Sequence, residues 1–172
     1  MNMMKKKRIA FFVLWLFLAL SASAQDAGRL SAGIDALYGT YVKSMGVGVK
    51  VRYGFSNTWR AEGAYSHFFK KDGITMQGFS VHGQYLLPAV GSLQAYPLAG
   101  LCLTHVKYDN MPTRYEDGGF IAVEKETHIG AAAGVGVDLT ITPHLILNAQ
   151  GLYQIVKNNH QGVFSIGVIY KF

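Results

Sequence analysis

Six histidines are the side chains of this chain best suited to proton transfer, and a serine precedes one of them. A hydrolase needs a serine, a histidine and a carboxylate within hydrogen-bonding reach of one another. Ser66 and His67 are adjacent, but neighbouring residues of a strand point to opposite faces of a sheet. His105, Glu126 and His128 flank a single predicted hairpin and could meet near its tip. We expect rim or structural histidines, no catalytic residues and no enzyme activity.

Metal and cofactor binding are not indicated by the spacing of the remaining candidates. Cys102 is the single cysteine, so it cannot form an internal disulfide, and no Cys/His spacing resembles a zinc site. The segment GVGV at residues 46–49 has a strand-like context, whereas a phosphate-binding loop joins a strand to a helix. We therefore expect no metal site and no cofactor.

A second set of residues is charged or ionisable. They stand at alternate positions in segments whose other residues are small or apolar. Their signs roughly balance, and buried charges need partners. We expect these side chains to form a paired polar plug in the interior of the molecule. A narrow conducting path lined by the same residues is the alternative. The set comprises Asp35, Lys50, Arg52, Arg60, Glu62, His82 and Asp138.

The elements that would position these residues have the period of β-strands. In MGVGVKVRYGF, residues 45–55, large apolar side chains alternate with glycine, lysine and arginine. Similar alternation recurs at 30–38, 59–68, 78–87, 128–139, 145–154 and 164–172, and residues 93–106 are extended but less cleanly two-faced. This pattern predicts an all-β chain of eight strands, each about ten residues long, the length of a tilted transmembrane strand. Pro97 would remove a ladder hydrogen bond, so a bulge is predicted there.

The connections between these strands alternate in length. Those at 56–58, 88–92 and 140–144 are short, and those at 39–44, 70–73, 107–126 and 157–162 are mostly longer or more polar. Membrane barrels have short periplasmic turns and longer outer loops. A three-residue turn at 56–58 also predicts a register in which Arg52 lies opposite Glu62 on the inside. Phe55 then lies opposite Trp59 on the outside.

The environment of the apolar face distinguishes a membrane barrel from a soluble lipocalin-like barrel. Charged residues make up 15% of the chain, against about 25% in ordinary soluble domains. The polar face is rich in small residues, as a narrow lumen requires, and aromatic residues gather at the strand ends. We predict an antiparallel up-and-down transmembrane barrel. It must be closed, because an open sheet edge in lipid would leave backbone groups unpaired.

The N-terminal segment has the pattern of a secretory signal peptide. Residues 5–8 are basic, an apolar run of about a dozen residues follows, and Ala22-Ser23-Ala24 fits a signal-peptidase site. The run is too short to span a bilayer as a helix. We expect residues 1–24 to be a cleaved signal peptide and residues 25–172 to be one β-barrel domain. Without the signal, 12 Lys and Arg face 10 Asp and Glu, so the charge does not indicate nucleic-acid binding.

The C-terminal strand resembles the signal that assembly machinery reads in bacterial outer-membrane proteins, with a final aromatic residue and alternating apolar residues. The matching residues are Phe164, Ile166, Val168, Tyr170 and Phe172. With the predicted signal peptide and eight strands, the chain resembles the OmpA/OmpX-like superfamily of outer-membrane β-barrels. This resemblance implies a location in the bacterial outer membrane, contact with its lipid and lipopolysaccharide, and insertion by the barrel-assembly machinery.

The expected function is non-enzymatic, with a structural or surface-interaction role in the envelope. A narrow porin passing ions or small solutes is the first alternative, and an outer-membrane lipid-modifying enzyme is the second. The longest connection is the candidate for contact with a partner or with lipopolysaccharide. Its acidic residues include Asp109, Glu116, Asp117 and Glu124. The sequence does not identify a surface ligand.

Overall fold

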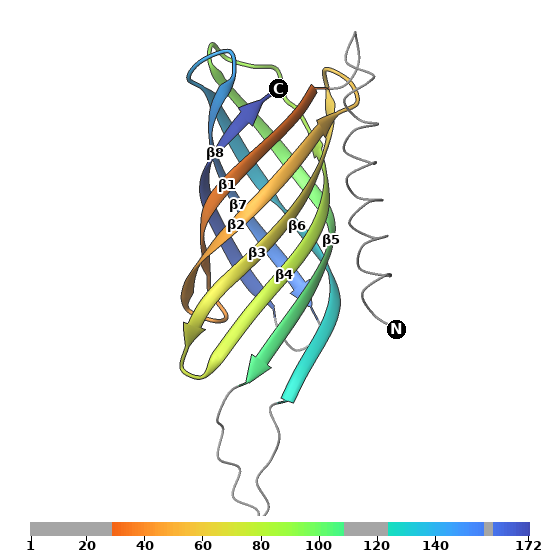
Figure 1. Ribbon diagram of the computed structural model, residues 1–172. Helices are drawn as coiled ribbons and strands as arrows, with labels where there is room; N and C mark the ends of the chain where they lie inside the picture. Colours follow the sequence, from red (N-terminus) through yellow and green to blue (C-terminus); the bar gives the residue numbers. More distant parts are fainter. Residues whose placement is uncertain (1–28, 109–123, 157–159) are drawn as a thin grey trace, which may run out of the picture.

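Alternating side chains along the chain correspond to eight β-strands in the computed structural model, which describes residues 29–108, 124–156 and 160–172 (Figure 1). The strands are β1 Arg29–Gly39, β2 Ser44–Gly54, β3 Trp59–Lys71, β4 Ile74–Tyr85, β5 Leu93–Tyr108, β6 Glu124–Thr140, β7 Leu145–Val156 and β8 Gln161–Lys171. Among the described residues, no helix is long and apolar enough to cross a membrane.

The strands form a closed ring in sequence order. Each pairs antiparallel with its neighbours, and β1 pairs with β8 from Ser31↔Lys171 to Gly39↔Val163. The last residue adds a further backbone contact, because Phe172 N–H donates to Leu30 O over 3.1 Å. The predicted closed, eight-stranded antiparallel barrel is therefore confirmed. Closure leaves no sheet edge that would have to find partners in hydrocarbon.

The short turn after β2 sets the register of the first hairpin as predicted. Arg52 pairs directly with Glu62, and Phe55 N–H donates to Trp59 O over 3.0 Å. Ser56 Oγ accepts from the Trp59 N–H at 3.0 Å, which stabilises the turn. Both residues of the Arg52–Glu62 pair therefore face the interior.

The predicted bulge at Pro97 is wrong. The pairing of β5 with β6 runs through Pro97↔Val135 without a shift, and the pairing of β4 with β5 ends at Gln84↔Leu98. Pro97 thus lies one residue beyond the end of the β4–β5 pairing, where strand β4 does not need a hydrogen bond from its missing N–H. The register shift lies in β3 instead, between Phe68 and Lys71, directly before the turn at Asp72.

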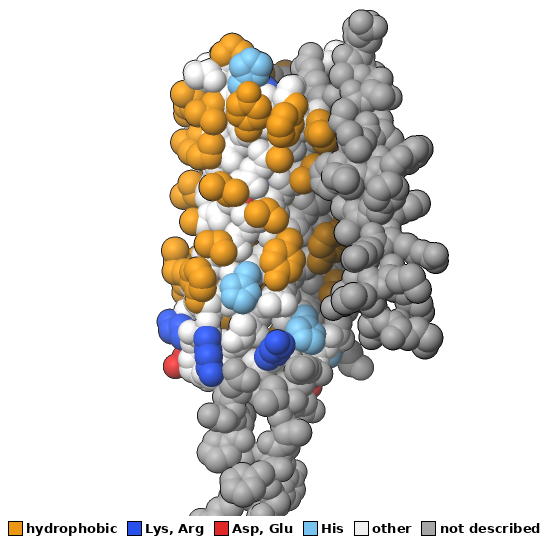
Figure 2. Space-filling model, in the orientation of Figure 1, with side chains coloured by type: hydrophobic (Ala, Val, Ile, Leu, Met, Phe, Trp, Pro, Cys, Tyr) orange, Lys and Arg blue, Asp and Glu red, His pale blue; other side chains and the backbone are white. Residues whose placement is uncertain are grey.

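The two faces of the sheet are inverted relative to a soluble protein. Large apolar side chains on the outer face are exposed, as at Ile34 (67%) and Ile129 (72%), whereas Arg52 on the inner face is 0% exposed. Figure 2 shows apolar side chains over the face of the barrel that is turned to the viewer. This surface requires a hydrocarbon environment, because water would leave many large apolar groups solvated.

The two ends of the barrel differ. The turns after β2, β4 and β6 and the C-terminus lie at one end, called here the short-turn end (Figure 1). Aromatic rings pack in pairs at this end, including Trp59 with Tyr85 and Tyr170 with Phe172, with centroids 5.1 and 5.3 Å apart. The opposite end, where β1, β3, β5 and β7 finish, is called the long-loop end. Aromatic side chains favour the interface between hydrocarbon and water.

Candidate functional site

The interior of the barrel contains all seven polar residues that the sequence analysis assigned to it. All seven side chains are buried, and the most exposed of them, Arg60, is 8% exposed. They are contributed by five strands: Asp35 from β1, Lys50 and Arg52 from β2, Arg60 and Glu62 from β3, His82 from β4, and Asp138 from β6. Three cations therefore face three carboxylates, so the charges balance when His82 is neutral.

Arg52 lies at the centre of this network. Its Nε donates to Glu62 Oε2 over 2.6 Å, and its Nη1 donates to the carboxylate of Asp138 over 3.1 and 3.2 Å. Its Nη2 donates to Tyr96 Oη over 3.0 Å. The planar guanidinium thus joins β2, β3, β5 and β6 through one side chain. Charge-assisted hydrogen bonds of this kind are the geometry in which a buried ion pair is best compensated.

Lys50 forms a second junction. Its Nζ lies 3.0 Å from Asp35 Oδ2, and it donates to Asn148 Oδ1 over 2.9 Å and to Gln150 Oε1 over 3.1 Å. Three donors of one ammonium group therefore find three acceptors, from β1 and β7. Gln150 in turn donates to Glu62 at 3.0 Å, which connects the Lys50 junction to the Arg52 junction.

Arg60 and His82 lie at the periphery of the network. Arg60 Nη2 is 2.9 Å from Asp138 Oδ2, and Arg60 Nε donates to Gln84 Oε1 over 2.5 Å. The Arg60 guanidinium also lies over the Tyr96 ring, 4.9 Å from its centroid. His82 Nδ1 is 3.7 Å from Glu62 Oε1, too long for a direct hydrogen bond.

Four polar residues of the network were not in the predicted set, although their sequence positions carried a usable signal. Gln84 lies two residues from His82 on β4, and Asn148 and Gln150 occupy alternate positions of β7, with Asn148 directly paired with Asp138. Tyr96 is 1% exposed, and Arg52, Asn148 and Gln150 all donate to its hydroxyl. The neighbouring Pro97 interrupts the alternation of polar and apolar residues in this strand, so Tyr96 was not assigned to the interior. Gly136 faces Tyr96 from β6, and a Cβ there would collide with the ring.

The long-loop half of the interior contains an apolar cluster, with the buried Gln161 beside it, which the sequence analysis did not anticipate. The buried cluster there consists of Leu37, Val42, Phe68, Met76, Val106 and Val163. Phe68, Met76 and Val106 are at most 1% exposed. Five of the cluster residues occupy inward positions near the ends of their strands, so local alternation placed them inside, whereas Val42 lies in the turn between β1 and β2. Their burial shows that the lumen has two layers, a charged layer and an apolar layer.

The catalytic arrangement considered for the histidines is not formed. His105 Nδ1 contacts Thr127 Oγ1 at 2.8 Å, whereas His128 Nε2 contacts Glu126 Oε2 at 2.9 Å. Since His105 pairs with Thr127 rather than with His128, the two imidazoles lie on opposite faces of the sheet. The expectation that these histidines could meet with Glu126 is therefore wrong. In the described part of the chain, no group of three or more His, Cys, Asp and Glu is arranged to hold a metal.

The remaining predicted residues are on the outside or beyond the described segments. The alternating residues of β8 face outward, with exposures of 58% for Phe164, 64% for Ile166, 41% for Val168, 50% for Tyr170 and 74% for Phe172. Asp109, Glu116 and Asp117 lie outside the described residues. Glu124 is the first residue of β6, and its side chain is not described.

A closed ring with apolar side chains outside and paired charges inside is the architecture of a transmembrane β-barrel. The chain belongs to the family of outer membrane protein beta-barrel domains, whose model matches residues 10–172. It is thus an outer-membrane β-barrel protein, and the family indicates the bacterial outer membrane as its location. No curated protein sequence matches the chain.

Solved structures share this fold. The N-terminal barrel of OprF from Pseudomonas aeruginosa has 18% sequence identity and a TM-score of 0.66, over 84% of this chain and 99% of that domain. Neisserial surface protein A has 21% identity and a TM-score of 0.62, over 86% and 98%. Ail of Yersinia pestis, in complex with the heparin analogue sucrose octasulfate, has 19% identity and a TM-score of 0.59, over 86% and 100%. At these identities the likeness concerns the fold.

Proposed function

We propose that the protein is a sealed, non-enzymatic outer-membrane barrel with a structural or surface-interaction role. The observation that supports this function is the filled lumen, in which the Arg52 network and the Phe68 cluster follow one another along the axis. An ion passing through would have to displace charge-paired side chains and then cross an apolar layer. Both steps are costly, because Arg52 and Lys50 already engage the carboxylates of the charged layer and the apolar layer offers no substitute for the water shell of the ion.

The proposed orientation places the long-loop end outside the cell and the short-turn end in the periplasm, as in other outer-membrane barrels. Residues 1–24 then serve as the cleaved signal peptide, and lipopolysaccharide surrounds the long-loop end. The acidic segment with Asp109, Glu116, Asp117 and Glu124 is the proposed partner-binding segment. The complex of Ail with sucrose octasulfate is a precedent for ligand binding by a barrel of this fold.

Planar-bilayer recordings test the sealed lumen. We expect the refolded wild-type protein to insert without stable single-channel steps, because buried side chains of the Arg52 network and the Phe68 cluster occupy the lumen. Insertion is verified independently by the heat-modifiable gel mobility of protein recovered from vesicles. Reproducible conductance steps would instead support the narrow-pore alternative. In that case the charged residues would line a conducting path.

We further propose that the outward residues of β8 serve as the assembly signal. Replacing Phe172 by serine is expected to remove most of the folded protein from the outer-membrane fraction of cells. Refolding of the purified variant into detergent should be nearly unchanged, because Phe172 is 74% exposed and packs mainly on Tyr170. Phe55→Ser is the matched control, since Phe55 is 60% exposed at the same end but belongs to the turn after β2. Equal loss of both variants from the membrane would contradict the assembly role.

A further inference from the structure

The outer wall changes from apolar to polar toward the long-loop end, and lysines lie at its rim. On adjacent strands β3 to β6, the paired residues Tyr65, Phe79, Leu103 and Ile129 form an apolar row. Two residues nearer the long-loop end, the paired residues His67, Gln77, His105 and Thr127 form a polar row. Figure 2 shows histidines between the apolar side chains and a group of lysines or arginines on this wall. This order matches the change from hydrocarbon to headgroups in a lipid leaflet.

The polar row is held in place by hydrogen bonds. His67 Nδ1 lies 3.4 Å from Gln77 Nε2, and His105 Nδ1 lies 2.8 Å from Thr127 Oγ1. Each imidazole thus has one nitrogen engaged within the row, and the row presents its other polar atoms to the surroundings. His67 and His105 lie two strands apart, so their Cα atoms are about 10 Å from one another.

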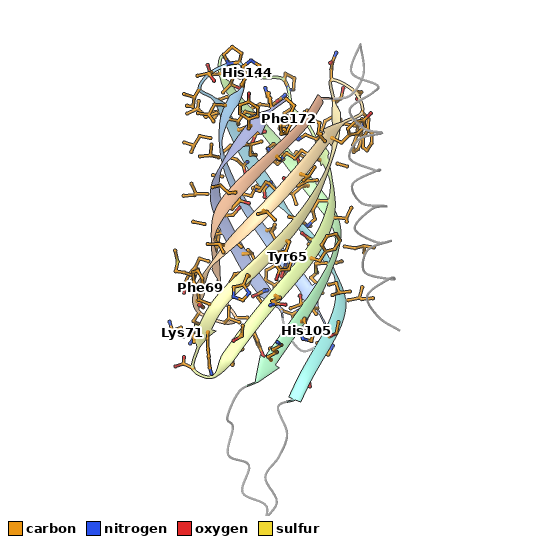
Figure 3. The ribbon with its side chains drawn as sticks, in the orientation of Figure 1. Tyr65, Phe69, Lys71, His105, His144 and Phe172 are labelled. Atoms are coloured by element: carbon orange, nitrogen blue, oxygen red, sulfur yellow. The ribbon has the colours of Figure 1, made fainter. Side chains whose placement is uncertain are left out.

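Lysines lie at the rim beyond the polar row, beside the half-exposed Phe69, which follows His67 by two residues on β3 and contacts its ring. Lys107 follows His105 by two residues on the same outer face and pairs with Thr75 of β4. Lys71 lies at the end of β3 (Figure 3), and its Nζ donates to the backbone carbonyl oxygen of Lys43 over 2.6 Å. Among the described side chains of this wall, Asp72 is the carboxylate on the outer surface, and Glu126 faces inward to His128. The described outer rim is therefore predominantly cationic.

An apolar groove ends at this polar row. It has a volume of about 550 Å³ on the outer face of β8, β1, β2 and β3, and its lining includes Ala36, Val47, Tyr65, His67 and Ile166. The floor is low because Ala36 is small between the larger side chains of Val47 and Ile166, its partners on the two neighbouring strands. Asp35 also lines the groove but its carboxylate faces the lumen and pairs with Lys50, so the outward His67 is the lining residue that connects the groove to the rim.

We propose that this wall binds one phosphorylated lipid of the surrounding leaflet, with an acyl chain in the groove and a phosphate among His67, His105 and Lys107. The occupant is a membrane lipid because the groove is apolar and lies on a face that hydrocarbon covers. The phosphate follows from the cationic rim, since lysine ammonium groups attract anionic headgroups at a membrane surface. The site rests on the proposed membrane orientation, in which lipid A, the phosphorylated anchor of lipopolysaccharide, surrounds the long-loop end. It does not depend on whether the lumen conducts.

Native mass spectrometry of the refolded full-length protein, titrated with bisphosphorylated lipid A, tests the site. Dephosphorylated lipid A with the same acyl chains is titrated in parallel. We expect one preferred lipid per barrel and weaker binding of the dephosphorylated form. Lys107→Gln should weaken binding of the phosphorylated form by about fivefold, the effect of one lysine near an anionic surface. The double variant H105Q/K107Q should weaken it further and leave the dephosphorylated form unaffected.

Ala36→Phe tests the groove separately, because it fills the floor without removing a charge. It should weaken both lipid forms, whereas Ala149→Phe, on the far side of Ile166, should not. Lys171→Gln, at the short-turn end, is the control for charge alone. Every variant must retain heat-modifiable mobility before it is titrated.

Three outcomes would overturn the site: equal binding of both lipid forms by the wild type, equal losses in K107Q and K171Q, or displacement of the lipid by millimolar inorganic phosphate. The last would indicate a site for free phosphate. Conductance steps in the bilayer experiment would contradict the sealed lumen and leave these titrations unchanged, so the two proposals can fail separately.

Discussion

Replacing Arg52 by methionine is expected to lower the free energy of unfolding by about 3–5 kcal/mol, the usual cost of removing one partner from a buried ion pair. The variant would remove the 2.6 Å hydrogen bond from Arg52 to Glu62 and the ion pair of Arg52 with Asp138. Both carboxylates are almost completely buried. Methionine fills much of the same volume, so the loss of unfolding free energy would come from the removed charge and not from a cavity. Urea unfolding in lipid vesicles, followed by gel mobility, measures it.

Two further variants make this result interpretable. Lys71→Met removes a cation from the exposed rim and should change the free energy of unfolding by no more than about 0.5 kcal/mol. The double variant R52M/E62L removes both members of the directly paired positions and should recover part of the loss, because the uncompensated Glu62 charge is gone. A loss in R52M no larger than that in K71M would show that the network does not stabilise the barrel.

Replacing Gly100 by alanine is expected to destabilise the barrel by about 3 kcal/mol, the upper end of the usual cost of overpacking. A Cβ at this position would collide with the carbonyl oxygen of Val81 and lie 2.7 Å from the Cα of His82. Both are backbone atoms of β4, so no side-chain rotation relieves the contact. Strands β4 and β5 would have to separate locally, which disturbs the ladder from Ile74↔Tyr108 to Gln84↔Leu98.

Gly63→Ala is the matched control for Gly100→Ala. Gly63 is also in a strand, on β3, but a Cβ there would meet nothing within 4 Å. We expect its free energy of unfolding to stay within about 0.5 kcal/mol of the wild type. The same urea titration compares the two variants. If both alanines are tolerated equally, β4 and β5 do not approach at Gly100 as closely as the structure describes.

Much of the architecture was predictable because it depends on local periodicity. Alternation in residues 45–55 separates apolar from small and charged side chains, and a strand converts that alternation directly into two faces. The three-residue turn at 56–58 was sufficient to predict the pairing of Arg52 with Glu62, since a hairpin register follows from its turn. The prediction at Pro97 failed because the effect of a missing N–H depends on where the neighbouring ladder ends.

The contents of the lumen were only partly predictable, because its contacts join strands that are distant in sequence. Lys50 binds Asn148 and Gln150, and Arg52 binds Tyr96 and Asp138, all from the opposite wall. Which residues meet across the ring depends on the stagger of the strands around the closed barrel. Periodicity in a single strand contains no information on that stagger.

The amino-acid sequence by itself determined the strands, the face of each side chain and the inversion that suits a membrane, because these properties follow from period-two alternation and from hydropathy. Only the tertiary structure decided that the charged residues form one connected network around Arg52 and that an apolar layer around Phe68 follows it. Ring closure also decided that His67 ends an apolar groove near the lysines of the rim. The physical reason is that closure brings together, at a defined stagger, walls that no local pattern relates.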